Sequence, residues 1–184
     1  MVMILESRGQ RQRGVQMEGS KKILVAVDDS EASDRAVGYV GQMTGANKAF
    51  QILLFHVPAP MPPKLLEFGG AEDPRQEQRA EAELRRAQAA WVEKVEEAAR
   101  PIFARAKSIL RQAQVPEEAV NTQLFTPPAE EDLDTSILEA ARANGCGTVV
   151  VGHKSFSWMQ ELFQTHVAEK LLRQAQHLAV WIVL

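Results

Sequence analysis

The sequence predicts an α/β fold in which helices flank a doubly wound, five-stranded parallel sheet. Five short segments are almost continuously apolar, as is typical of strands that are buried on both faces. Segments whose apolar residues recur at helical spacing separate these runs. Strands and helices therefore alternate along the whole chain, which indicates parallel strands joined by right-handed crossovers.

The first strand is expected at residues 22–28, which read Lys-Ile-Leu-Val-Ala-Val-Asp. Asp29 or Ser30 can then cap a helix that ends near Gly45 and carries its apolar residues on one side. The second strand is expected at residues 51–57, because a proline-rich loop that cannot continue a strand follows directly.

A long helical segment is predicted to begin near Asp73. Its apolar stripe consists of Leu84, Ala87, Trp91, Val95, Ala98, Ile102, Ala106 and Ile109. Pro101 lies inside this stripe, and a proline removes one helical hydrogen bond and clashes with the preceding turn. The sequence therefore predicts a kink, or two abutting helices, at Pro101.

The second half repeats the pattern. An alternating segment at residues 119–125 predicts a third strand with one less buried face, and the next helix should stop at Asn144-Gly145. The fourth strand is expected at residues 148–151, followed by a helix from about Trp158 to Gln174. A fifth strand is expected from Leu178 to Leu184.

The totals restrict the class of protein. The 184 residues fit one domain at residues 21–184, and residues 1–20 look like a flexible tail or a start-site extension, with Met17 as a plausible start. A net charge of −3 disfavours nucleic acid as a partner. The single cysteine, Cys146, can form no internal disulfide and is expected to be a small packing residue at a strand. No segment approaches the roughly 20 apolar residues of a membrane span, so we expect a cytoplasmic protein.

The last strand is apolar and carries no charge that would block edge-to-edge pairing. An identical strand from a second copy is the simplest cover for such an edge. The sequence therefore predicts a homodimer through the strand that begins at Leu178 and ends at Leu184.

Several segments together resemble the universal stress protein family over residues 21–184. They are Lys22-Ile-Leu-Val-Ala-Val-Asp-Asp-Ser, His56-Val57, Val149-Val-Val-Gly, Val167-Ala-Glu-Lys-Leu-Leu-Arg and Val180-Trp-Ile-Val. The resemblance implies an adenine-nucleotide alpha-hydrolase-like fold with strand order 3-2-1-4-5 and a dimer formed through the last strand. It also implies that some members bind ATP in a cleft above strands one and four.

In those members the loop after strand four resembles Gly-x2-Gly-x9-Gly followed by Ser or Thr. Here Gly152 keeps the first position, while the next three hold Ser155, Thr165 and His166. Glycine lets backbone N–H groups close on phosphate oxygens, so the loss of two glycines weakens the expected cradle. The hydroxyl groups of Ser155 and Thr165 still leave phosphate binding open.

By the same resemblance, Asp28 corresponds to an acidic residue near adenine and ribose, and Val57 to an apolar contact. A structural role is equally open for each: Asp28 could help to cap the first helix, and Val57 could be a core residue. The expected nucleotide-contacting set is Asp28, Val57, Gly152, Ser155, Thr165, His166 and Val167.

No catalytic or metal-binding pattern is recognised. There is no G-x-S-x-G elbow, no Walker or Rossmann glycine motif, and no close pair among the four histidines. A phosphoacceptor receiver domain is excluded because Phe125-Thr126 stands where its acceptor aspartate should be. Two hypotheses remain: a non-catalytic stress-response homodimer that acts through protein partners, or a switch or slow hydrolase that binds ATP with Mg²⁺.

Overall fold

The computed structural model describes residues 20–66, 74–126, 132–153 and 167–184. The predicted N-terminal tail lies outside the described residues except for Ser20, as does the predicted start of the last helix near Trp158. Among the described residues, no helix combines the length and the apolar character that crossing a bilayer requires.

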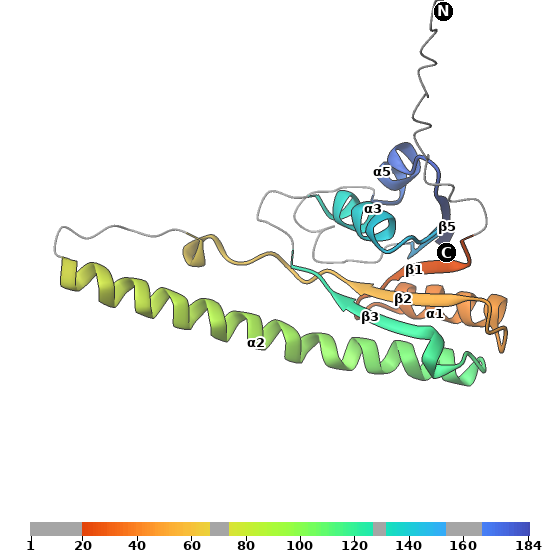
Figure 1. The fold of residues 1–184 in the computed structure, drawn as a ribbon, viewed down its shortest axis with the longest axis horizontal. Helices are drawn as coiled ribbons and strands as arrows, with labels where there is room; N and C mark the ends of the chain where they lie inside the picture. Colours follow the sequence, from red (N-terminus) through yellow and green to blue (C-terminus); the bar gives the residue numbers. More distant parts are fainter. Residues whose placement is uncertain (1–19, 67–73, 127–131, 154–166) are drawn as a thin grey trace, which may run out of the picture.

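The sheet has five strands in the order β3-β2-β1-β4-β5, and every neighbouring pair is parallel (Figure 1). This arrangement confirms the doubly wound fold and the strand order that the resemblance implied. The strands are β1 (Lys22–Ala26), β2 (Gln51–His56), β3 (Val120–Leu124), β4 (Thr148–Gly152) and β5 (Ala179–Val183). Each prediction is correct to within two residues at either end.

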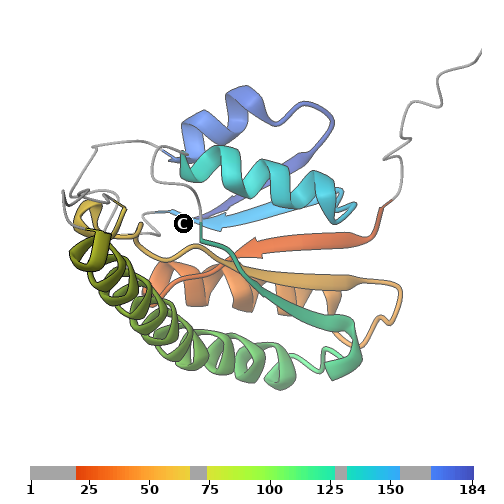
Figure 2. The same cartoon turned by 60° about the vertical axis from the view of Figure 1, so that its left-hand side comes forward.

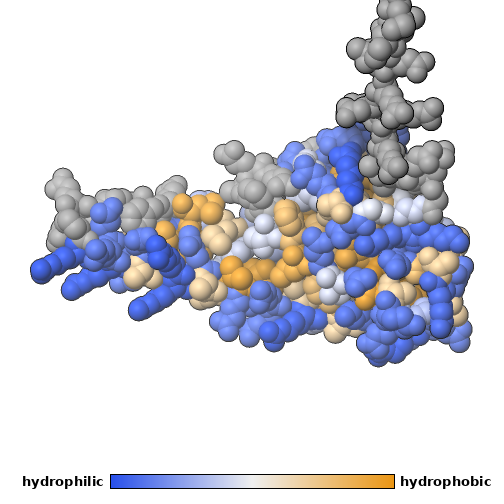
Figure 3. Space-filling model, in the orientation of Figure 1, coloured by the Kyte–Doolittle hydropathy of each residue, from blue (hydrophilic) through white to orange (hydrophobic). Residues whose placement is uncertain are grey.

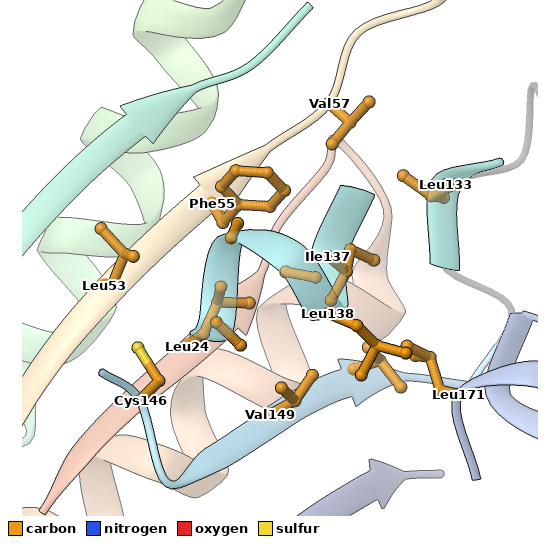
Figure 4. Close-up of a cluster of buried hydrophobic side chains, with 14 residues drawn as sticks. Leu24, Leu53, Phe55, Val57, Leu133, Ile137, Leu138, Cys146, Val149 and Leu171 are labelled. Carbon is orange, nitrogen blue, oxygen red and sulfur yellow. The ribbon is translucent and has the colours of Figure 1, made fainter. Parts of the chain in front are cut away.

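Helices cover both faces of this sheet, as Figure 2 shows. Their bounds are α1 (Glu31–Thr44), α2 (Pro74–Gln112), α3 (Leu133–Ala143) and α5 (Val167–Gln174), with short 3₁₀ turns η1 (Pro63–Leu65) and η2 (Glu117–Ala119). Successive residues of β1 serve opposite faces, because side chains alternate along a strand. Leu24 packs in a cluster with residues of α3 and α5 (Figure 4), whereas Ile23 packs in a second cluster with residues of α1 and α2.

Local sequence explains the ends of α1. The Oγ of Ser30 accepts a hydrogen bond from the backbone N–H of Ser33 at 3.2 Å, which satisfies one of the donors that a helix start leaves free. At the other end Gly45 has a φ of 48° and its N–H donates to the carbonyl of Gly41. Ser30 is therefore the cap, and the predicted stop at Gly45 is confirmed.

α2 runs as one helix of 39 residues straight through Pro101. The prediction of two abutting helices is wrong, and Figure 1 shows a continuous ribbon without a sharp bend. Pro101 and Glu97, whose carbonyl loses its helical donor, both lie on the exposed side of the helix. Water can hydrate that carbonyl, so the missing hydrogen bond does not require a break.

β5 forms one edge of the sheet, and its apolar side chains are only partly covered. Val180, Trp181, Ile182 and Val183 are all half-buried. Beside them α1 exposes Tyr39 by 42% and Met43 by 56%, and the rings of Tyr39 and Trp181 meet edge to face with centroids 5.8 Å apart. The edge of the sheet therefore carries an apolar surface that continues onto α1.

Candidate functional site

The predicted site residues lie where the strands end. Asp28 follows β1 by two residues, Val57 follows β2 directly, and Gly152 is the last residue of β4. Because β1 pairs with both β2 and β4 in parallel, the carboxyl ends of these three strands meet at one edge of the sheet. Ligands of open parallel sheets bind at this edge.

Asp28 is 4% exposed and shapes the turn between β1 and α1. Its Oδ1 accepts hydrogen bonds from the N–H of Ser30 at 3.1 Å and from the Ser30 hydroxyl at 2.5 Å. The N–H of Asp28 in turn donates to the Oγ of Ser33 at 3.1 Å. The carboxylate therefore positions the residue that caps α1, which is the structural role that the sequence left open.

Val57 is fully buried in the core cluster that also contains Phe55 and Leu133 (Figure 4). It is a core residue, as the sequence allowed. Gly152 is also buried, and it pairs with Val183 of β5. The next residue, His153, is exposed and fixes the loop start by donating its backbone N–H to the carbonyl of Val183 at 2.6 Å.

The structure adds two polar residues that are not in the expected nucleotide-contacting set. His56, at the end of β2, is 8% exposed, and its Nδ1 lies 2.7 Å from the carbonyl oxygen of Val27. Since a carbonyl can only accept, Nδ1 carries the proton. Burial lowers the pKa of His56 below its usual value, although the Val27 hydrogen bond and the charges of Asp28 and Asp29 oppose this effect. His56 is therefore a neutral donor at physiological pH.

Arg105 ties α2 to the same edge of the sheet. Its Nε lies 2.8 Å from Oδ1 of Asp34 in α1, and its Nη2 donates to the carbonyl of Asp28 at 3.2 Å. One side chain thus connects α2, α1 and the end of β1. The sequence does not indicate this role for Arg105, because its partners Asp34 and Asp28 lie 71 and 77 residues earlier in the chain.

Comparison with known proteins now identifies the relatives of this arrangement. The family model described as the universal stress protein family matches residues 19–183. The chain belongs to the universal stress protein family. No curated protein sequence matches it.

Solved universal stress proteins share the fold. A family member from Burkholderia pseudomallei is 22% identical, with a TM-score of 0.58 over 91% of this chain and 97% of that one. An Archaeoglobus fulgidus universal stress protein in complex with dAMP is 15% identical, with a TM-score of 0.54 over 89% and 97%. A universal stress protein in complex with cAMP is 16% identical, with a TM-score of 0.50 over 89% and 95%.

In this universal stress protein the structure brings Asp28, Val57 and Gly152 to one edge of the sheet. Ser155, Thr165 and His166 lie outside the described residues, and Val167 begins α5 with its side chain outside them. Within the described ranges, no three His, Cys, Asp or Glu side chains cluster as a metal site would require. Cys146 is fully buried, and burial raises the pKa of its thiol despite the charge of Lys22, which agrees with its predicted packing role.

Proposed function

We propose that this universal stress protein is a non-catalytic homodimer that acts in the stress response by binding other proteins. The observation that carries the proposal is the apolar edge at β5. Its half-buried side chains adjoin the exposed Tyr39 and Met43 of α1. An apolar edge strand is an aggregation hazard, and pairing it with the same strand of a second copy removes the hazard under two-fold symmetry.

The strand-end site supports a non-catalytic role. The Asp28 carboxylate is engaged in the turn that caps α1, and Val57 is enclosed by the core. In the sequence two of the three phosphate-cradle glycines are replaced by Ser155 and Thr165. A side chain at such a position hinders the approach of backbone N–H groups to phosphate oxygens, so tight binding of ATP with Mg²⁺ is not expected.

A second candidate is the binding of an adenine nucleotide that carries a single phosphate. Two proteins of the same fold have been solved in complex with cAMP and with dAMP. One phosphate needs a smaller cradle than a triphosphate, and Gly152 keeps its place at the end of β4. In this alternative the contacts come from Asp28, the backbone of Val57, Gly152 and Val167, with the hydroxyl groups of Ser155 and Thr165 and the ring of His166 at the phosphate.

Calorimetric titration with ATP and Mg²⁺, AMP and cAMP separates the two candidates. The first predicts no heat with any of them and an unshifted melting temperature. Binding of cAMP or AMP near micromolar Kd, about −8 kcal/mol, would replace it with the second candidate. The variant Ser155→Gly/Thr165→Gly should gain affinity for ATP if the lost glycines are what limits binding.

Sedimentation velocity tests the dimer. Met43→Lys, on the exposed face of α1, should shift the protein toward the monomer because it places a charge in the apolar contact. Ile182→Lys on β5 should do the same, but Ile182 also packs against the core of its own chain, so its melting temperature is measured alongside. Thr122→Lys is the matched control, since it adds the same charge to an exposed position of β3 at the opposite edge of the sheet. A wild-type monomer at all concentrations would refute the dimer.

A further inference from the structure

The first half of α2 extends beyond the ends of the strands (Figures 1 and 2). We call residues 75–98 of this helix the arm. A helix of 39 residues is about 58 Å long, which exceeds the length of a five-residue strand more than threefold. The arm therefore presents surface that packing against the sheet does not explain.

One side of the arm is braced by its own chain. Its half-buried residues recur at helical intervals and are Ala80, Glu81, Leu84, Gln88, Trp91 and Val95. The Nε2 of Gln88 donates to the carbonyl of Leu65 at 2.8 Å, which fixes the segment around η1 along this side. The other sides of the arm remain exposed.

A second stripe lies on an exposed flank, and we call it the seam. It consists of Ala82, Arg85, Ala89, Val92 and Glu96, all of them exposed. The spacing of 3, 4, 3 and 4 residues is that of the contact positions of a coiled coil. Val92 is 43% exposed, and the side chain of Arg85, which pairs with Glu81 on the same helix, is 73% exposed. Figure 3 shows the arm as mostly hydrophilic, with paler apolar residues between the charges.

The order of charges along the seam makes it complementary to itself in one orientation. Arg85 lies toward one end and Glu96 toward the other, with Ala89 and Val92 between them. In an antiparallel pair centred between Ala90 and Trp91, Arg85 of each copy meets Glu96 of the partner subunit, and Ala89 meets Val92 of the partner subunit. A parallel pair would instead set arginine against arginine and glutamate against glutamate.

We propose that the seam is a self-association surface through which the arms of two copies of this chain pair antiparallel. Alanine at the centre lets the helices approach closely, and the charged ends select the antiparallel register. This contact is distinct from the β5 edge. If β5 also pairs, the arms join two such dimers; if β5 does not pair, the arms alone make a dimer.

A charge-swap series measured by sedimentation velocity tests the pairing. Arg85→Glu and Glu96→Arg should each raise the dissociation constant of the association that doubles the mass by about tenfold. Each change sets like charges against one another at both symmetry-related ends of the seam. The double variant Arg85→Glu/Glu96→Arg should restore it. Arg86→Glu and Glu97→Arg make the same charge changes outside the seam and should leave association unchanged.

The double variant retains the Arg85→Glu change, which sets two acidic side chains one helical turn apart because Glu81 stays in place. If the double variant associates as tightly as wild type, loss of helix stability cannot explain the weaker association of the single variants. A wild-type chain that shows no seam-dependent step, or a double variant as weak as the singles, would overturn the proposal. Ile182→Lys on β5 and Met43→Lys on α1 should leave the charge-swap pattern intact. Failure of the β5 dimer is thus distinguishable from failure of the seam.

Disulfide trapping tests the register. When the Ala89→Cys and Val92→Cys proteins are mixed under mild oxidation, the mixed disulfide should form in preference to either homodimer, and mass spectrometry distinguishes the three products. Cys146 is fully buried and can stay in place. Ala90→Cys, exposed on another side of the arm, is the control. If the Ala90→Cys protein forms disulfide-linked dimers in the same yield as the Ala89→Cys and Val92→Cys mixture, the proposed geometry is wrong.

Discussion

Gly41 of α1 faces the end of α2 at a distance that leaves no room for a side chain. A Cβ built on Gly41 would lie 2.8 Å from the Cβ of Ala113 and 3.5 Å from Cδ2 of Leu110. Gly38, one turn earlier on the same helix, has its nearest neighbour, Cγ2 of Ile109, at 3.8 Å from such a Cβ, which is ordinary contact. The two glycines therefore form a matched pair for substitution by alanine.

Alanine in place of glycine inside a helix stabilises by about 0.5–1 kcal/mol. Gly38→Ala should show this gain. At Gly41 the gain is opposed by overpacking, which costs about 1–3 kcal/mol. We expect Gly41→Ala to lower the free energy of unfolding by about 1 kcal/mol, so the two variants should differ by about 2 kcal/mol, or about 4–8 °C in Tm for a domain of this size.

Urea unfolding followed by tryptophan fluorescence, at one fixed protein concentration, measures this difference. Adding Ala113→Gly to Gly41→Ala should recover most of the loss, because it removes the atom that the new methyl group meets. If Gly41→Ala proves as stabilising as Gly38→Ala, the close approach of α1 and α2 does not limit this position and the reasoning is wrong.

Three further predictions concern stability. The pKa of His56 is lowered on folding, so protonation favours the unfolded chain. The free energy of unfolding should therefore be highest above the unfolded pKa of about 6.5 and should fall as the pH drops below it. Urea unfolding from about pH 8 to 5 should show a smaller pH dependence for His56→Gln than for wild type. Ser30→Ala should cost about 1 kcal/mol through the lost cap of α1, whereas Ser108→Ala, at an exposed position of α2, should cost nothing measurable in thermal melts. Gly147→Ala should cost about 1–3 kcal/mol, because its Cβ would lie 2.7 Å from the carbonyl oxygen of Ser20; an unchanged urea midpoint would contradict this contact.

The strand-end site was partly predictable from sequence. Asp28 and Gly152 stand directly after or at the end of apolar runs, and parallel strands bring such positions to one edge. The contacts that His56 and Arg105 make at this edge were not predictable. Their partners, the carbonyl oxygens of Val27 and Asp28, are backbone atoms that carry no signal of residue type.

Local sequence by itself determined the five strands, a cap at Asp29 or Ser30 and the stop at Gly45, because buried apolar runs, a capping side chain and a glycine at positive φ act over a few residues. Tertiary structure alone decided that α2 continues through Pro101, that Gly41 meets Ala113, and that Arg105 joins α2 to α1 and β1. Each of these depends on which side of a helix faces solvent and which faces a distant element. Periodicity in one segment cannot specify the position of another segment about 70 residues away, and packing of the whole chain supplies that information.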